Sequence, residues 1–243
     1  MKKKIIYILI ICVGFTSIIC FSWMLYDHLQ LGSGNNEEVL IKKYPGNQTA
    51  FKFISSKGVK LISDPCYLNE TVKADVVTEA NNHIDHTETS RITGNFKLIN
   101  TTGNFNIKEI HIAGYPGINS KGDNWTSNII YVYDIDGIHI VQLSSQGEML
   151  DEDTLKKIGK TDILIIQIID HYTKMGLNEA YKMIKKLEAK IVIPAHGNQA
   201  LNPDLAALFK EDVDYKSSGI IMVTREMLEK IKKPKILVLD NGD

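Results

Sequence analysis

Two apolar runs in the second half of the sequence restrict its fold more than any other feature. Residues 162–169 (DILIIQII) and 190–196 (KIVIPAH) contain few polar side chains, as is typical of strands in a sheet covered on both faces. A helical pattern precedes each run. Residues 151–159 start with acidic side chains and stop at Gly159, which are helix start and stop signals. Residues 177–189 place one apolar stripe at helical spacing, made of Leu177, Ala180, Ile184 and Leu187.

The first half of the chain predicts strands. Residues 49–55, 58–65 and 74–78 are short β-rich segments, and residues 128–143 hold two more, joined at Asp136-Gly137. That dipeptide between β-rich runs indicates a hairpin. Strands followed by alternating helices and strands predict a layered α/β domain whose helices pack outside its sheets.

The N-terminus has a different character. Three lysines, Lys2 to Lys4, precede about 19 uncharged residues from Ile5 to Trp23, enough to cross a bilayer as a helix. No small-residue cleavage site follows, so we predict an uncleaved transmembrane helix, with a cleaved signal as the alternative. Residues 1–25 are then the basic tail and anchor, 26–39 a tether and 40–243 the domain. The lysines stay cytoplasmic, which makes this a single-pass cell-membrane protein with an extracytoplasmic domain.

Charge and cysteine content exclude other classes of protein. The chain has 28 basic and 29 acidic residues, and its lysines are scattered along the sequence, so we predict no nucleic-acid surface. Beyond the apolar run Cys66 is the single cysteine. It predicts a packing residue, and no disulfide can form within the domain.

A short polar segment carries the chemistry. Residues 76–90, VVTEANNHIDHTETS, contain His83, Asp85 and His86, and imidazole and carboxylate are ligands for zinc and similar ions. In an extended strand His86 would point away from the other two, so they converge only if the backbone turns here.

An isolated H-x-D-H segment is more often a surface loop, and its context decides between the two interpretations. This segment follows a buried-type strand, and a later one ends at His196. Strand ends are where distant parts of a layered fold meet. The context therefore favours a metal site that combines His83, Asp85 and His86 with His196. Zinc is the first choice, and iron and manganese are alternatives.

The order of these segments resembles the metallo-β-lactamase superfamily, most closely its L-ascorbate-6-phosphate lactonase-like branch. The resemblance extends from Leu40 to Asn198 and includes KADVVTEANNHIDH, DGIHIVQLSSQG, the Asp170-His171-Tyr172-Thr173 stretch and KIVIPAH. It implies a four-layer αββα sandwich with a metal site at one edge.

The resemblance also implies which ligands are missing. In the family motif H-x-H-x-D-H, the first histidine falls on Asn81, and the others match His83, Asp85 and His86. A further family histidine falls on Gln142, the bridging aspartate on Ser145, and a histidine near the start of the domain on Asn47. The first metal position would thus keep only His83 of its three histidines. The second keeps Asp85, His86 and His196 but loses the bridging carboxylate to Ser145. The resemblance thus implies one divalent metal on these three ligands, with the other position empty or weak.

The resemblance implies a hydrolase in which a metal-activated water attacks an ester, lactone or phosphoester of a small-molecule substrate. Asp85 would serve the reaction as a ligand and His83 as proton acceptor or residual ligand, while His171 and Tyr172 would orient substrate or stabilise charge. Two alternatives stay open. In the first, the chain has lost catalysis and serves as a binding or scaffolding module. In the second, a substitute ligand comes from Asn82, Gln146 or Glu148.

Overall fold

The computed structural model describes residues 37–44, 49–119, 127–167, 175–195, 207, 213–216 and 219–239. The chain divides into two compact units, Met1–Asn36 and Glu37–Asp243, and every described residue belongs to the second. The predicted transmembrane helix lies outside the described residues. Within the described part, no helix is long and apolar enough to span a bilayer.

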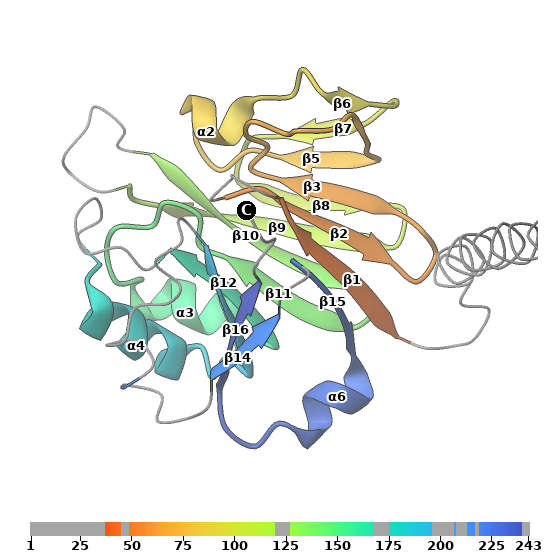
Figure 1. Cartoon of the computed structure of the whole chain (residues 1–243). Coiled ribbons are helices and arrows are strands. Elements are labelled where there is room, and N and C mark those ends of the chain that lie inside the picture. The colour runs from red at the N-terminus through yellow and green to blue at the C-terminus, as the bar shows by residue number, and fades with distance from the viewer. Residues whose placement is uncertain are drawn as a thin grey trace, which may run out of the picture. The chain divides into compact units, whose positions relative to one another are not determined.

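The first of two large sheets has six strands in the order β15-β1-β2-β3-β5-β7 (Figure 1). In β1, fully buried side chains alternate with partly buried ones, because successive residues of a strand face opposite sides of the sheet. Its strands are β1 (Glu38–Lys43), β2 (Phe51–Ser55), β3 (Lys60–Ser63), β5 (Val76–Thr78), β7 (Lys97–Ile99) and β15 (Ile220–Thr224).

The second sheet has eight strands in the order β14-β16-β13-β12-β11-β10-β9-β8. The predicted hairpin is confirmed: β10 and β11 pair antiparallel across the turn at Asp136-Gly137. From β11 onwards the pairing is parallel. Its strands are β8 (Gly103–Ile107), β9 (Ile110–Gly117), β10 (Asn128–Ile135), β11 (Ile138–Gln142), β12 (Ile163–Gln167), β13 (Ile191–Ala195), β14 (Val213–Lys216) and β16 (Lys235–Leu239).

The main core lies between the two sheets. It includes Val39 and Phe53 from the six-stranded sheet and Tyr133, Ile163 and Ile193 from the eight-stranded sheet, none of which is exposed to solvent. The rings of Phe53 and Tyr133 meet across the interface with centroids 5.4 Å apart. Burial of apolar area on this scale is the main force that holds the sheets together.

Both helices predicted in the second half are present. In α3 (Glu152–Ile158) the side chain of Asp151 caps the N-terminus by accepting from the backbone N–H of Thr154, and the helix ends at Gly159. The other helix, α4 (Leu177–Lys186), buries Ala180 and Ile184. The two helices cover the outer face of the eight-stranded sheet (Figure 1), as the αββα prediction requires.

The other outer layer is described only in part. Within the described ranges, the outer face of the six-stranded sheet packs against Leu68, Val72 and Ile92, which come from loops and a two-stranded sheet. That small sheet consists of β4 (Val72–Lys73) and β6 (Ile92–Thr93). The other two helices among the described residues are short, α2 (Ile84–Thr87) and α6 (Arg225–Lys230). Neither is a long helix laid across the sheet, so the sheet's small apolar outer patch is closed by irregular chain.

Candidate functional site

The polar segment after β5 turns as the ligand hypothesis requires. His83 is the extended N-cap residue of the single-turn helix α2, and the backbone N–H of His86 donates to the carbonyl of His83 over 2.9 Å. Thr49 Oγ1 donates to the carbonyl of Asp85 over 2.8 Å and ties the turn to the start of β2. As a result, Nδ1 of His83 contacts Oδ1 of Asp85, and His86 points into the protein and is 1% exposed.

His86 lies between carboxylates from two sides. Its Nδ1 is 3.2 Å from Oδ1 of Asp64, close enough for an ion pair although without hydrogen-bond geometry. Its Nε2 is 3.6 Å from Oδ1 of Asp85 and 3.0 Å from Oγ of Ser145. Burial opposes protonation of this imidazole, but the negative charges of Asp64 and Asp85 outweigh burial and raise the pKa of His86.

Asp64 organises the inner side of this site. It follows β3 with a left-handed φ of 44° and is buried. It accepts hydrogen bonds from the backbone N–H of Ala80 over 2.8 Å, from Nε2 of Gln142 over 2.8 Å and from Oγ of Ser144. A buried carboxylate needs such donors to stay charged. Asp64 thus joins the ends of β3, β5 and β11 at one point.

Sequence reasoning missed Asp64 as a member of the site, because Asp64-Pro65 was read only as the end of a strand. A detectable signal did exist. A carboxylate directly after a buried strand lies at the strand-end edge where distant segments meet. The partners that reveal its role, Gln142 and Ser144, are 78 and 80 residues away in the sequence, and no local pattern links them.

The substituted ligand positions gather beside His86. Oδ1 of Asn81 accepts from the backbone N–H of His83 over 2.9 Å, and its Nδ2 lies 3.4 Å from Oγ of Ser145. Both polar ends of Asn81 are therefore in use. Gln142 donates through Nε2 to Asp64, and its buried Oε1 has no hydrogen-bond partner among the described residues. The first metal position thus presents neutral carboxamides where imidazoles are expected, which suits zinc poorly.

The second metal position fits a cation better. Two ligand atoms of a tetrahedral zinc ion lie about 3.4 Å from each other, and Nε2 of His86 and Oδ1 of Asp85 are 3.6 Å apart. Asp64 behind His86 corresponds to the outer carboxylate that orients metal-binding imidazoles. Among the residues the structure describes, no group of three or more His, Cys, Asp or Glu side chains is arranged to hold a metal ion.

Three predicted site residues lie outside the described residues, namely His171, Tyr172 and His196. The strand before His196 is described, and its register is informative. Ile193 of β13 is in line with Ile165 of β12, which is in line with Gln142 of β11. The last residues of β11 and β13 therefore lie at the same edge of the sheet, separated by β12.

The substitute ligands considered from the sequence are not drawn to His86. Oε1 of Gln146 accepts from the backbone N–H of Ile118 over 2.9 Å, and its Nε2 donates to the carbonyl of Glu148. Gln146 therefore fixes the loop after β11 to the end of β9. The polar neighbours of the His86 imidazole described above are Asp64, Asp85 and Ser145.

The other histidines of the domain have structural partners. His139 Nδ1 is 2.5 Å from Oδ1 of Asp134, and its Nε2 is 3.0 Å from the carbonyl of Ile158. His111 lies 3.4 Å from the other oxygen of Asp134. Both histidines are therefore held by contacts within the fold. The prediction of Cys66 as a packing residue is confirmed, because it is buried and in no disulfide.

Comparison with known proteins agrees with this arrangement. A model described as the β-lactamase superfamily domain matches residues 45–196. The chain is 27% identical over 222 residues to a UPF0173 metal-dependent hydrolase of Methanosphaera stadtmanae, covering 72% of this chain and 92% of the relative.

Solved structures are similar over most of the chain. A Thermotoga maritima protein described as a zinc-dependent hydrolase of the metallo-β-lactamase superfamily superposes with a TM-score of 0.67 and 26% identity. It covers 83% of this chain and 98% of that one. A metal-dependent hydrolase from Parabacteroides distasonis shares the fold with a TM-score of 0.59 and 17% identity, covering 84% and 94%.

Proposed function

We propose that this chain, which belongs to the metallo-β-lactamase superfamily, is a hydrolase that uses one divalent metal ion. Its homologues are named metal-dependent hydrolases. The observation that carries the single-metal proposal is the placement of His86, whose Nε2 is near Asp85 while its Nδ1 is near the buried Asp64. Neutral carboxamides at Asn81 and Gln142 argue against a second strongly bound ion.

The proposal requires a third ligand, and His196 is the candidate. In the sequence it follows Ala195, the last residue of β13, and the end of β13 lies at the same sheet edge as the end of β11. Together with Asp85 and His86, it would complete two imidazoles and one carboxylate, leaving one coordination position open for substrate or water.

Zinc is the first choice of metal. The ligand set suits zinc, iron and manganese alike, and the Thermotoga maritima relative is described as zinc-dependent. When bound, such a cation supplies the Lewis acidity that activates water near neutral pH.

The protein's own side chains would handle the protons. His83 is half-exposed and contacts Asp85 through Nδ1, which leaves Nε2 as the atom that can accept a proton from the attacking water. Asp85 holds that ring in one orientation. Oγ of Ser145, beside Nε2 of His86, can donate a hydrogen bond to a developing negative charge.

His171 and Tyr172 are proposed to orient the substrate, an ester, lactone or phosphoester of a small molecule. The narrower likeness to the L-ascorbate-6-phosphate lactonase-like branch supports a lactone or phosphoester. It stays a prediction, because the relatives found are named only as metal-dependent hydrolases. The basic tail and the apolar run Ile5–Trp23 support anchoring to the cell membrane, with the domain on the extracytoplasmic side.

The test is metal content paired with turnover. The full-length chain in detergent is purified gently, its metals are measured by mass spectrometry, and hydrolysis of nitrophenyl esters and of bis-nitrophenyl phosphate is assayed. We expect one metal per chain, and loss of metal and turnover together in Asp85→Ala, His86→Ala and His196→Ala. His111→Ala is the matched control, because that histidine is partly exposed on β9, and it should keep both. Full metal content in His196→Ala would overturn the ligand assignment.

The alternative is a non-catalytic binding or scaffolding member of the family. It is favoured by the carboxamides of Asn81 and Gln142, which stand where the resemblance expects imidazoles. Chelation separates the two functions. A metal that binds only the folded state stabilises the protein, so a chelator should lower the thermal unfolding temperature if the metal hydrolase proposal holds. An unchanged temperature together with no turnover would favour the alternative.

A further inference from the structure

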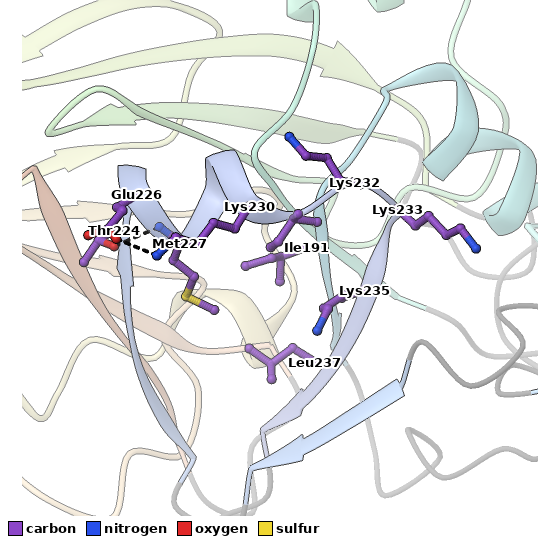
Figure 2. A pocket seen from close by; sticks show the side chains of 10 residues that line it. Ile191, Thr224, Glu226, Met227, Lys230, Lys232, Lys233, Lys235 and Leu237 are labelled. Carbon is purple, nitrogen blue, oxygen red and sulfur yellow. Dashed lines mark hydrogen bonds and ion pairs between the residues drawn. The ribbon is translucent and has the colours of Figure 1, made fainter.

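A cleft of about 610 Å³ lies beside α6, away from the histidine turn. Ile191, the first residue of β13, lines it (Figure 2), whereas the candidate metal site is at the other end of that strand. Its apolar side chains are Ile191, Met227, Ile231 and Leu237. The mouth of the cleft is basic, formed by Lys230, Lys232, Lys233 and Lys235, which we call the lysine face.

The lysine face concentrates positive charge that composition does not reveal. Residues 225–235 contain five basic and two acidic side chains, and all four lysines of the face are exposed. The ammonium groups of Lys232 and Lys233 point away from the apolar side chains (Figure 2). The expectation that the lysines are scattered along the sequence is therefore wrong at this corner, because four of them fall within residues 230–235.

Two of the five basic side chains in residues 225–235 are in ion pairs. Nη1 of Arg225 lies 2.8 Å from Oδ2 of Asp162. Lys230 pairs with Glu226 at 2.5 Å, and Nζ of Lys232 donates to the backbone carbonyl of Glu229 over 3.0 Å. Among the described residues, Lys233 and Lys235 have no ion pair. A second hollow beside the cleft, lined in part by Lys185 and Lys190, continues the basic surface.

The chain enters the domain at this same corner. Glu38 of β1 is in register with Thr224 of β15, which lines the cleft. The backbone N–H of Arg225, the first residue of α6, donates to the carbonyl of Glu37 over 3.3 Å. The domain therefore begins against the wall of the cleft.

The segment before Glu37 is short. Thirteen residues, Met24–Asn36, separate it from the apolar run, and they span at most about 45 Å when extended. A membrane that holds the run must lie within that reach of the cleft.

We propose that the lysine face docks on the anionic phospholipid surface of the membrane that holds residues 5–23. The proposal rests on the anchoring part of the proposed function. Clustered lysines next to a membrane segment bind acidic headgroups, and the apolar side chains below them suit the hydrocarbon edge of a lipid better than a soluble anion. In this orientation the metal site, at the far end of β13, faces the aqueous side and takes a water-soluble substrate.

The test is lysine footprinting of the full-length chain in vesicles. One set of vesicles is phosphatidylcholine alone, and the other contains about 30% phosphatidylglycerol. An amine-reactive reagent labels accessible lysines in each set, and peptide mass spectrometry measures the labelling of each lysine. We expect Lys232, Lys233 and Lys235 to react about fivefold more slowly in the anionic vesicles, with recovery in about 0.5 M salt. Lys156 and Lys157 of α3, which are exposed, should react equally in both sets.

The anchor is tested separately by alkaline carbonate extraction from the neutral vesicles, which an inserted helix survives. If extraction removes the chain, the anchor is refuted, and flotation with anionic vesicles tests the lysine face alone. Wild type and K156Q/K157Q should then float, and K232Q/K233Q/K235Q should not. Equal labelling in both vesicle sets overturns the docking proposal. Protection by inorganic phosphate without vesicles overturns it as well, in favour of a small-anion site.

Discussion

Asp64 and His86 form a buried carboxylate–imidazole pair, with Oδ1 of Asp64 3.2 Å from Nδ1 of His86 and side-chain exposures of 1% and 2%. The two residues come from different segments, the end of β3 and the turn after β5. Because the pair fixes the direction of the imidazole, it points Nε2 at the position proposed for the metal. Metal affinity and fold stability therefore depend on the same contact.

Asp64→Asn should weaken metal binding about 10- to 100-fold, the usual effect of removing an outer partner of a ligand imidazole. It should also lower the free energy of unfolding. Three donors converge on the carboxylate, from Ala80, Gln142 and Ser144. In the variant, the side-chain NH₂ group is also a donor, so it would face one of these donors without forming a hydrogen bond. Competition with a chromophoric chelator measures the affinity, and urea unfolding measures the stability.

Asp75→Asn is the control for that experiment. Asp75 also accepts from a backbone N–H, that of Lys60, and pairs with Lys108, but it is at the opposite end of the strands. It should reduce stability slightly and leave metal affinity unchanged. The role assigned to Asp64 is wrong if both variants bind metal as tightly as wild type.

The missing ligands should be restorable. The triple variant Asn81→His, Gln142→His and Ser145→Asp supplies two imidazoles and a bridging carboxylate around His83, at positions that already meet beside His86. We expect two metals per chain instead of one, measured by mass spectrometry of the purified protein. The Asn81→His variant alone lacks the rest of the set and should still bind one. A triple variant that folds and still binds one metal would refute the assignment of Asn81 and Gln142 to a lost metal position.

Local pattern predicted the elements whose geometry is set by neighbouring residues. The turn at Asp136-Gly137 has left-handed φ values of 49° and 70°, as a two-residue hairpin demands. The cap of α3 at Asp151 and its stop at Gly159 also follow from nearby residues. The turn at His83–His86 was predictable as a requirement, because those ligands could not otherwise converge.

Long-range pairing was not predictable from pattern. β15 lies next to β1, although more than 170 residues separate them in the sequence, and no local signal encodes this. The role of Asp64 depends on long-range contacts in the same way, because its partners Gln142 and Ser144 lie 78 and 80 residues away. The roles of His171, Tyr172 and His196 stay predictions.

Stability should depend on pH through Asp134 and His139. The hydrogen bond from His139 lowers the pKa of Asp134, and the same bond, opposed by burial, raises the pKa of His139. The contribution of Asp134 to the free energy of unfolding is present above the pKa of an unfolded aspartate, about 3.9. It is lost as pH falls through the lower pKa that Asp134 has in the folded protein. The histidine contribution is complete below about pH 6.5 and is lost as pH rises through the higher folded value.

The measurement compares wild type with Asp134→Asn by urea unfolding at about pH 5.5 and about pH 8.5. The stability lost by the variant should be larger at the lower pH, where the imidazole is charged. His111→Gln is the control, because it removes only the weaker contact with Asp134 at 3.4 Å. Its loss of stability should differ less between the two pH values. A loss that is equal at the two pH values, or larger at the higher, would contradict the assigned pair.

Two glycines separate backbone strain from steric conflict. Gly58 has a φ of +80° with nothing within 4 Å of an added Cβ, whereas Gly94 has a φ of +102° and its Cβ would lie 2.9 Å from the carbonyl oxygen of Ala74. Gly58→Ala should cost about 1 kcal/mol from its left-handed backbone alone. Gly94→Ala should cost about 2–3 kcal/mol, because the backbone of β4 must also move. Urea unfolding of the two variants gives the difference, and a smaller loss for Gly94→Ala than for Gly58→Ala would show that the β4–β6 sheet yields freely.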